Sequence, residues 1–97
     1  MNLIFEWDEN KAQLNLRNHK ISFEEAKTVF NDSMLVTFLD ENHSDYEERF
    51  ISIGVSSNSR LLLVVHTEQE SGGDTVLIRI ISSRKALKHE RRAYEEK

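Results

Sequence analysis

The stretch VLIRIISSRKALKHERRAY, residues 76–94, decides how the rest of the chain is interpreted. Val76–Ser82 is apolar apart from Arg79 and predicts a strand, whereas the part from Arg84 onward is strongly basic and predicts a helix. Residues 79–97 hold seven basic and three acidic side chains, while residues 1–78 hold six basic and fourteen acidic ones. The net charge of −4 hides this asymmetry. A basic strand-to-helix corner on an acidic body indicates a site that binds an anion.

The composition of the 97 residues is typical of one globular domain, residues 1–97. Hydrophobic residues make up 38% of the chain, which is enough for a modest core. The sequence contains no cysteine, and this excludes disulfides, zinc fingers and thiol nucleophiles. The N-terminus has neither a basic region nor a long apolar run. We therefore expect a cytoplasmic protein that is not secreted and does not span a membrane.

Upstream of residue 76 the apolar spacing changes from helical to strand-like. Asp8 stands where the N-cap of a helix over residues 9–19 belongs, and Ser22 with Glu25 forms a capping box for a second helix. The buried helix faces are predicted to carry Ala12, Asn15, Leu16 and His19, and then Phe23, Ala26, Val29 and Phe30. The predicted strands are Asn2–Glu6, Met34–Leu39, Arg49–Val55, Leu61–His66 and Val76–Ser82. The expected fold class is α+β, with two N-terminal helices packed on a mainly antiparallel sheet of about four strands and a C-terminal helix.

On a helical wheel that starts at Arg84, the basic side chains of the C-terminal helix occupy one sector. The opposite sector, which we expect to pack on the sheet, contains Ala86, Leu87, Ala93 and Tyr94, interrupted by Glu90. A carboxylate facing the protein needs a cation, and Arg49 and Arg79 on the strands are the candidates. The basic sector itself is equally consistent with a solvated helix face. Arg79, inside an apolar strand, indicates either a structural salt bridge or a phosphate contact.

The four histidines show no metal-ligand spacing. His66 ends an apolar strand, and the sequence leaves open whether it is a core histidine or a general acid or base. His43, in a polar loop, is interpreted as a surface residue. Trp7 and Tyr94 offer stacking surfaces for bases, although packing is the simpler interpretation of both.

Three strings resemble the BrnT family of bacterial type II toxins and together span nearly the whole chain. They are EWDENKAQLNLRNHKISFEEAKTVFND, HSDYEERFISIGVSSNSRLLLVVHTE and IRIISSRKALKHERRAYEE. The resemblance implies a fold similar to the RelE and ParE toxins and a ribonuclease that arrests translation and growth. It also implies a BrnA-like antitoxin with a ribbon-helix-helix domain, which contacts operator DNA within a toxin–antitoxin hetero-oligomer. The chain departs from the family at Lys20 and Ser59, where the family usually has Gly, and at Gln69, where it often has Arg.

The activity implied by the resemblance is metal-independent RNA cleavage without a cofactor, by attack of the ribose 2′-OH on the adjacent phosphate to give a 2′,3′-cyclic phosphate. Such chemistry needs cations for the phosphorane and a group that moves protons. The predicted catalytic residues are Arg49, His66, Arg79, Arg84 and Glu48, with Glu90 as a further candidate for proton transfer. The predicted RNA-binding residues are Arg60, Lys88 and Arg92.

Two other functions remain open from the sequence: a binding module without chemistry, and a ParE-like gyrase inhibitor. The antitoxin is expected to cover either the basic C-terminal corner or the first-helix face around Lys11, Asn15 and His19.

Overall fold

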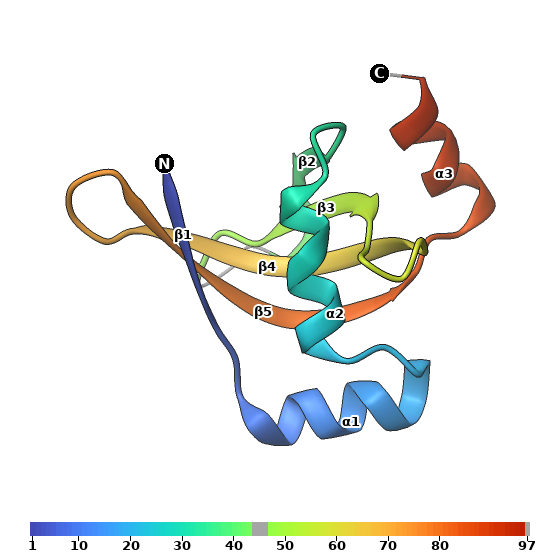
Figure 1. Cartoon of the computed structure of the whole chain (residues 1–97), viewed down its shortest axis with the longest axis horizontal. Coiled ribbons are helices and arrows are strands. Elements are labelled where there is room, and N and C mark those ends of the chain that lie inside the picture. The colour runs from blue at the N-terminus through green and yellow to red at the C-terminus, as the bar shows by residue number, and fades with distance from the viewer. Residues whose placement is uncertain (44–46, 97) are drawn as a thin grey trace.

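The computed structural model describes residues 1–43 and 47–96, which form a mixed sheet and three α-helices (Figure 1). The helices are α1 (Glu9–His19), α2 (Phe23–Lys27) and α3 (Lys88–Glu95), and two short 3₁₀ helices are η1 (Thr28–Asn31) and η2 (Glu41–His43). The strands are β1 (Asn2–Glu6), β2 (Val36–Leu39), β3 (Phe50–Val55), β4 (Leu61–Glu70) and β5 (Thr75–Lys85). Within the described residues, no helix is both long and apolar enough to cross a membrane.

The sheet has five strands in the order β1-β5-β4-β3-β2, which corrects the expected count of about four. Strands β2 to β5 pair antiparallel, as predicted, but β1 pairs parallel with β5. The β1 register runs from Asn2 opposite Thr75 to Glu6 opposite Arg79. Spacing along the chain cannot reveal this pairing, because it joins the first and last strands.

The first two helices cover one face of the sheet and build the larger core there. Phe23 and Ala26 of α2 pack with Val29, and this cluster continues onto the strands through Leu62, Val64, Ile78 and Ile80. These contacts confirm the apolar stripe predicted for the second helix. Figure 1 shows α2, in cyan, lying across β4 and β5. Trp7 also packs here, edge-on to Phe23 with ring centroids 5.9 Å apart.

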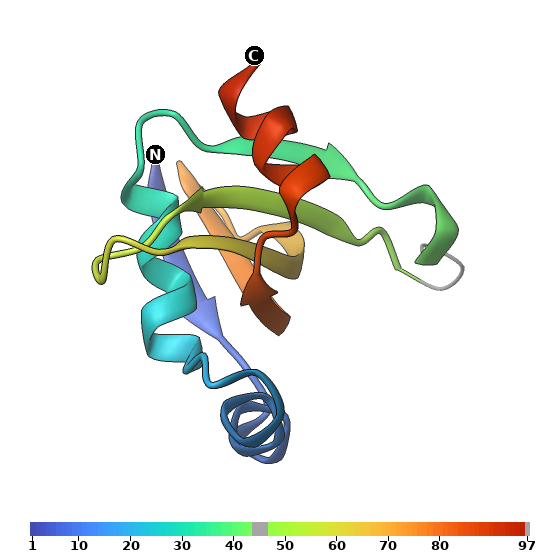
Figure 2. The same cartoon turned by 90° about the vertical axis from the view of Figure 1, so that its right-hand side faces the viewer.

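The third helix lies over one end of the opposite face, as the quarter-turn view shows (Figure 2). A smaller core of Ile53, Leu61 and Leu63 meets Ala86, Ala93 and Tyr94 there. The Tyr94 hydroxyl donates to Asp32 Oδ2 at 2.6 Å and ties α3 to the corner before β2. Leu87, predicted to pack on the sheet, is 52% exposed because it is the N-cap residue of α3.

The N-termini of the first two helices are capped as predicted. Asp8 accepts from the N–H groups of Asn10 and Lys11 at 2.8 and 3.2 Å, and Ser22 Oγ accepts from Glu25 N–H at 3.0 Å. The Glu25 carboxylate does not complete a reciprocal box but turns toward Arg60. The caps therefore fix where both helices begin.

Asn15 is the buried residue of α1, whereas its predicted neighbour Leu16 is half exposed. The Asn15 amide donates to the carbonyls of Ile21 (2.8 Å) and Ser83 (2.9 Å) and accepts from Ser83 N–H at 3.0 Å. The predicted face is therefore confirmed at Asn15 and wrong at Leu16 and His19, which are exposed. Asn15 is also too buried to belong to a partner-binding surface.

The last strand is longer than predicted and the last helix shorter. β5 continues through Arg84 to Lys85, so the expected helix start at Arg84 is wrong. Pairing with β4 carries the strand onward, because Leu63 lies opposite Arg84 and Leu62 opposite Lys85. A register shift at Val65/His66 marks a β-bulge within this pairing.

Lys20 and Ser59 adopt positive φ angles of 60° and 61°, which is the left-handed region that glycine tolerates best. Lys20 is the C-cap of α1, with its N–H bonded to the Leu16 carbonyl at 3.0 Å. These are the two positions where the family resemblance expects Gly.

Replacing Lys20 with Gly is therefore expected to stabilise the protein by about 0.5–1 kcal/mol, measured by urea denaturation. The matched control is Lys11→Gly in the interior of α1, which should destabilise the protein by about 1 kcal/mol because its backbone is helical. Equal destabilisation by both changes would contradict the argument from backbone strain.

Candidate active site

A cleft opens on the sheet face that carries α3, next to that helix. We call it the open-face cleft, and its volume is about 450 Å³. Its floor contains apolar side chains of β3 and β4 and serines of β5, and its rim contains histidines and charged groups. It is lined by His19, Asp40, Asn42, His43, Ile51, Leu63, Val65, Ser82, Ser83, Arg84 and Glu90. The rim comes from four separate parts of the chain: the end of α1, the segment after β2, the end of β5 and the first turn of α3.

Arg84 and Glu90 form a two-pronged ion pair at this cleft. Arg84 Nη1 and Nη2 donate to the two Glu90 carboxylate oxygens at 2.7 and 2.8 Å. Glu90 Oε1 also accepts from Leu87 N–H at 2.7 Å, so the same carboxylate caps α3. The Arg84 hydrogen bonds lower the pKa of Glu90, and the carboxylate raises the pKa of Arg84. Glu90 was expected to pair with Arg49 or Arg79; its partner is Arg84, because Arg84 belongs to the strand and faces α3.

Arg79 lies on the same side of the sheet but does not line the open-face cleft. It precedes Arg84 by five residues on β5, roughly 15 Å along a strand. Its side chain is 48% exposed, because α3 does not reach this part of the face, and its Nη1 lies 3.5 Å from Glu6 Oε2. The structural salt bridge considered from the sequence is therefore present, although it is a solvent-exposed one.

Arg49 and Glu48 lie just before β3. Arg49 Nε is 3.9 Å from Glu47 Oε1, and the Arg49 carbonyl accepts from Asp40 N–H at 2.7 Å. This backbone bond joins the two ends of the segment that carries His43. Glu48 is exposed and, like Arg49, is not among the residues lining the cleft.

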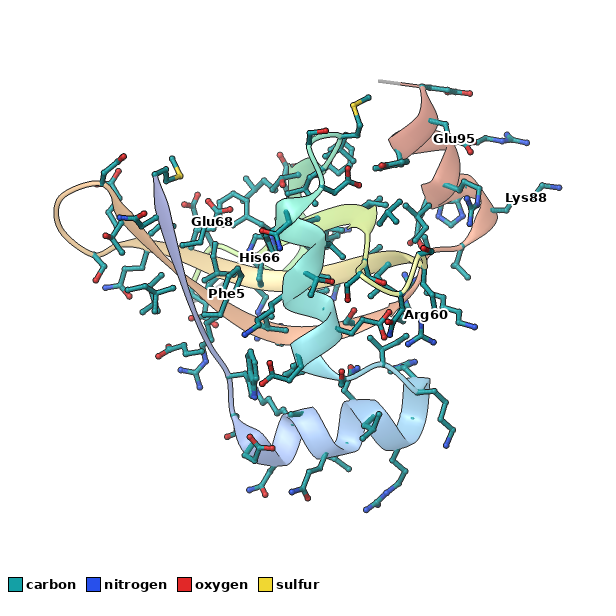
Figure 3. The ribbon with its side chains drawn as sticks, viewed as in Figure 1. Phe5, Arg60, His66, Glu68, Lys88 and Glu95 are labelled. Carbon is teal, nitrogen blue, oxygen red and sulfur yellow. The ribbon has the colours of Figure 1, made fainter. Side chains whose placement is uncertain are left out.

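His66 is fully buried on the opposite face of the sheet, beneath α2 (Figure 3). Its Nε2 is 2.7 Å from Ser52 Oγ, which in turn is 2.8 Å from Thr37 Oγ1. The ring packs edge-on against Phe30 and stacks on Phe50. Burial lowers the pKa of His66 to about 4. These contacts favour the core-histidine interpretation and keep RNA away from the ring.

The burial of His66 predicts a stability that depends on pH. The pKa of this histidine is 6.5 in the unfolded chain and about 4 in the folded protein. Between these two pH values the unfolded chain therefore binds more protons than the folded protein. Stability should therefore fall as the pH drops, by roughly 2 kcal/mol between pH 7 and pH 5. Urea denaturation at both pH values measures this fall. His66→Gln should reduce it, whereas His89→Asn, at an exposed position, should leave it unchanged.

Arg60 lies at the turn between β3 and β4, beside α2 and away from the open-face cleft (Figure 3). Its Nε donates to Glu25 Oε2 at 2.9 Å, its Nη2 pairs with Glu25 Oε1, and Ser56 Oγ donates to the same carboxylate at 2.6 Å. The Arg60 hydrogen bond is the main reason that the pKa of Glu25 falls to about 2. The predicted RNA-binding residue is therefore engaged in a structural pair.

Lys88 and Arg92 are exposed on α3, and Figure 3 shows Lys88 pointing away from the protein. Both belong to the helix that forms one side of the cleft. Of the residues predicted for catalysis and RNA binding, the structure thus places Arg84 at the cleft, together with Glu90, and leaves Lys88 and Arg92 on the adjoining helix.

The family model for BrnT, the ribonuclease toxin of type II toxin–antitoxin systems, matches residues 7–90. The chain belongs to the BrnT family. No curated protein matches it in sequence. Among solved structures it is similar to the Brucella abortus ribonuclease toxin BrnT, with 21% identity and a TM-score of 0.57. The similarity covers 91% of this chain and all of the Brucella chain, and at that identity it establishes a shared fold.

Within this BrnT fold the residues that sequence reasoning missed are His19, His43 and Asp40 at the cleft. The interpretation of His43 as a surface residue is confirmed, since its side chain is 68% exposed, but nothing in the spacing shows that it also lines the cleft. Its presence in the string that carries the BrnT resemblance was the one available signal. His19 was considered only as part of a helix face.

Proposed function

We propose that this BrnT-family chain is a metal-independent endoribonuclease toxin that binds the scissile RNA phosphate at the open-face cleft. The observation that carries the proposal is the Arg84 guanidinium, held by Glu90 at the cleft between the sheet and α3. A guanidinium has a planar fork that matches a phosphate and keeps its charge at any physiological pH. It therefore supplies a fixed cation where the pentacoordinate phosphorane develops negative charge.

Glu90 keeps Arg84 in place before RNA arrives. The guanidinium donates two hydrogen bonds to Glu90 and a third, from Nη1, to the Lys85 carbonyl at 3.3 Å, which leaves two of its five N–H groups to bind a phosphate oxygen. The carboxylate also caps α3 through Leu87 N–H, which couples the position of Arg84 to that of the helix. Arg84 is thus preorganised rather than flexible, and its orientation does not have to be fixed during the reaction.

Neighbouring basic residues extend the phosphate-binding surface beyond the cleft. Lys88 and Arg92 are exposed on α3, and Arg79 is half exposed farther along the same sheet face. Such contacts bind the RNA backbone without reading its sequence, and they weaken with increasing salt. Arg49 lies at the base of the segment that carries His43, where its carbonyl accepts from Asp40 N–H.

The family also suggests the biological setting. The toxin cleaves cytoplasmic RNA, which arrests translation and growth, and a BrnA-like ribbon-helix-helix antitoxin neutralises it in a hetero-oligomer that binds operator DNA. An antitoxin segment that presents carboxylates would compete with RNA for Arg84, Lys88 and Arg92. We also propose that the fold is related to that of the RelE toxins.

The test incubates the purified protein with a defined single-stranded RNA, with and without chelator. The expected result is cleavage that persists in chelator and leaves a 2′,3′-cyclic phosphate and a 5′-hydroxyl, identified by mass spectrometry. RNA methylated at every 2′-oxygen should bind but remain intact, because the nucleophile is blocked. Loss of cleavage in chelator would refute metal independence. Absence of RNA cleavage combined with inhibition of gyrase would replace the proposal with a ParE-like function.

A further inference from the structure

His43 is held by a carboxylate at the rim of the open-face cleft. Its Nδ1 lies 3.1 Å from Asp40 Oδ2 and 3.3 Å from Asp40 Oδ1. Asp40 is itself fixed, because its N–H donates to the Arg49 carbonyl at 2.7 Å and its side chain is only 12% exposed. The His43 side chain is 68% exposed, so its ring is oriented by Asp40 while remaining accessible to a ligand.

The contact with Asp40 determines which ring nitrogen of His43 is available. An ionised carboxylate accepts hydrogen bonds but cannot donate them, so the proton of the neutral ring belongs on Nδ1. The Nε2 lone pair is then free to accept a proton, in the arrangement that a carboxylate imposes on a histidine base.

A second histidine lines the same cleft from another element. His19 is the last residue of α1, a helix that the Asn15–Ser83 hydrogen bonds fix against β5. The positive φ of Lys20 ends the helix directly after it. The cleft therefore combines two histidines with Arg84, which is the set of groups needed to bind a phosphate and to move protons on both sides of it.

We propose that His43, oriented by Asp40, is the general base of RNA cleavage and that His19 is the general acid; this rests on the proposed function. His43 Nε2 takes the proton of the 2′-OH as the 2′-oxygen forms its bond to phosphorus. The bond from phosphorus to the 5′-oxygen breaks, and protonated His19 gives its proton to that oxygen. The products are a 2′,3′-cyclic phosphate and a 5′-hydroxyl, and exchange of protons with water restores both histidines.

The charged neighbours of the two histidines come from several elements. Among the described residues of the cleft they are Asp40 before η2, Arg84 on β5 and Glu90 on α3. Glu90 and Arg84 largely satisfy each other, which leaves Asp40 as the carboxylate bonded to His43. The roles of base and acid are assigned on this basis: His43 is the base, because the Asp40 carboxylate orients its ring.

The test compares His43→Asn, His19→Asn and the matched control His89→Asn in single-turnover cleavage of RNA. His89 is 75% exposed on α3 and does not line the cleft. Both cleft variants should lose about 10²–10⁴-fold in cleavage rate while His89→Asn keeps the wild-type rate. Binding of fully 2′-O-methylated RNA should change less than threefold in all of them, and thermal melting should confirm that each variant is folded.

The pH dependence of the rate assigns the two roles. The wild-type profile should be bell-shaped; His43→Asn should lose the fall in rate at acidic pH, and His19→Asn the fall at alkaline pH. If the wild-type protein cleaves RNA and both variants keep its cleavage rate and its bell-shaped pH profile, the assignment of His43 and His19 is overturned while the proposed function stands. If wild-type protein does not cleave RNA at all, both are overturned.

Discussion

Replacing Arg84 with glutamine is expected to lower the rate of RNA cleavage by about 10²–10³-fold, the typical effect of losing one preorganised group that stabilises transition-state charge. Glutamine is polar but shorter than arginine, so the change removes the cation and the two bonds to Glu90, while Leu87 N–H still donates to that carboxylate. The measurement is single-turnover cleavage of RNA at saturating protein. Binding of 2′-O-methylated RNA should weaken much less than cleavage, since the phosphorane carries more negative charge than the bound phosphate.

The matched control for this prediction is Arg17→Gln, at an exposed arginine of α1 that does not line the cleft. Its rate should equal that of the wild type. The cleavage rate of Arg84→Lys should lie between those of Arg84→Gln and Arg17→Gln, because lysine keeps the charge but not the planar fork. If the cleavage rate of Arg84→Gln lies within threefold of the wild-type rate, Arg84 does not stabilise the transition state, even if the protein is a ribonuclease.

The fate of Arg84 also shows why the C-terminal region was misassigned from sequence. The run Arg84–Lys88 has no feature that ends a strand, and its charges suit a helix as well as a strand. β4 decides the outcome, because its residues Leu62 and Leu63 pair with Lys85 and Arg84 and so keep them in the strand. Local periodicity cannot report the register between two strands. By contrast, the starts of the first two helices depend on the nearby capping residues Asp8 and Ser22, and they were predicted well.

The same distinction between local and distant information applies to the site. The sequence pointed correctly to a basic region at the end of β5 and to a carboxylate, Glu90, that needs a cation. It could not select Arg84 over Arg49 and Arg79, because that choice depends on which strand positions face α3. The placement of His66 and His43 also depends on which face of the sheet each one meets, which the sequence does not show. His66 faces the covered side of the sheet, and His43 lines the cleft on the open one.

Replacing Arg60 with alanine is expected to give the largest loss of stability among these substitutions, lowering Tm by at least about 15 °C at pH 7. The Glu25 carboxylate is only 7% exposed and would keep the Ser56 hydroxyl as a donor but lose its cation. Breaking a buried pair is costly because the remaining charge is neither solvated nor compensated. Scanning calorimetry or the loss of the far-ultraviolet circular dichroism signal measures this change.

The pH dependence distinguishes this explanation from a simple loss of packing. The depressed pKa of Glu25, about 2 compared with an ordinary 4.5, means that its pairing stabilises the folded protein above pH 4.5. That stabilisation is lost as the pH falls toward 2, since protonation of Glu25 removes the charge that Arg60 compensates. The difference in Tm between wild type and Arg60→Ala should therefore shrink as the pH is lowered from 7 to 3. Adding Glu25→Gln to Arg60→Ala should recover part of the loss at pH 7, because a neutral amide needs no cation. A difference in Tm that stays constant with pH would show that Arg60 acts through its packing instead of its charge.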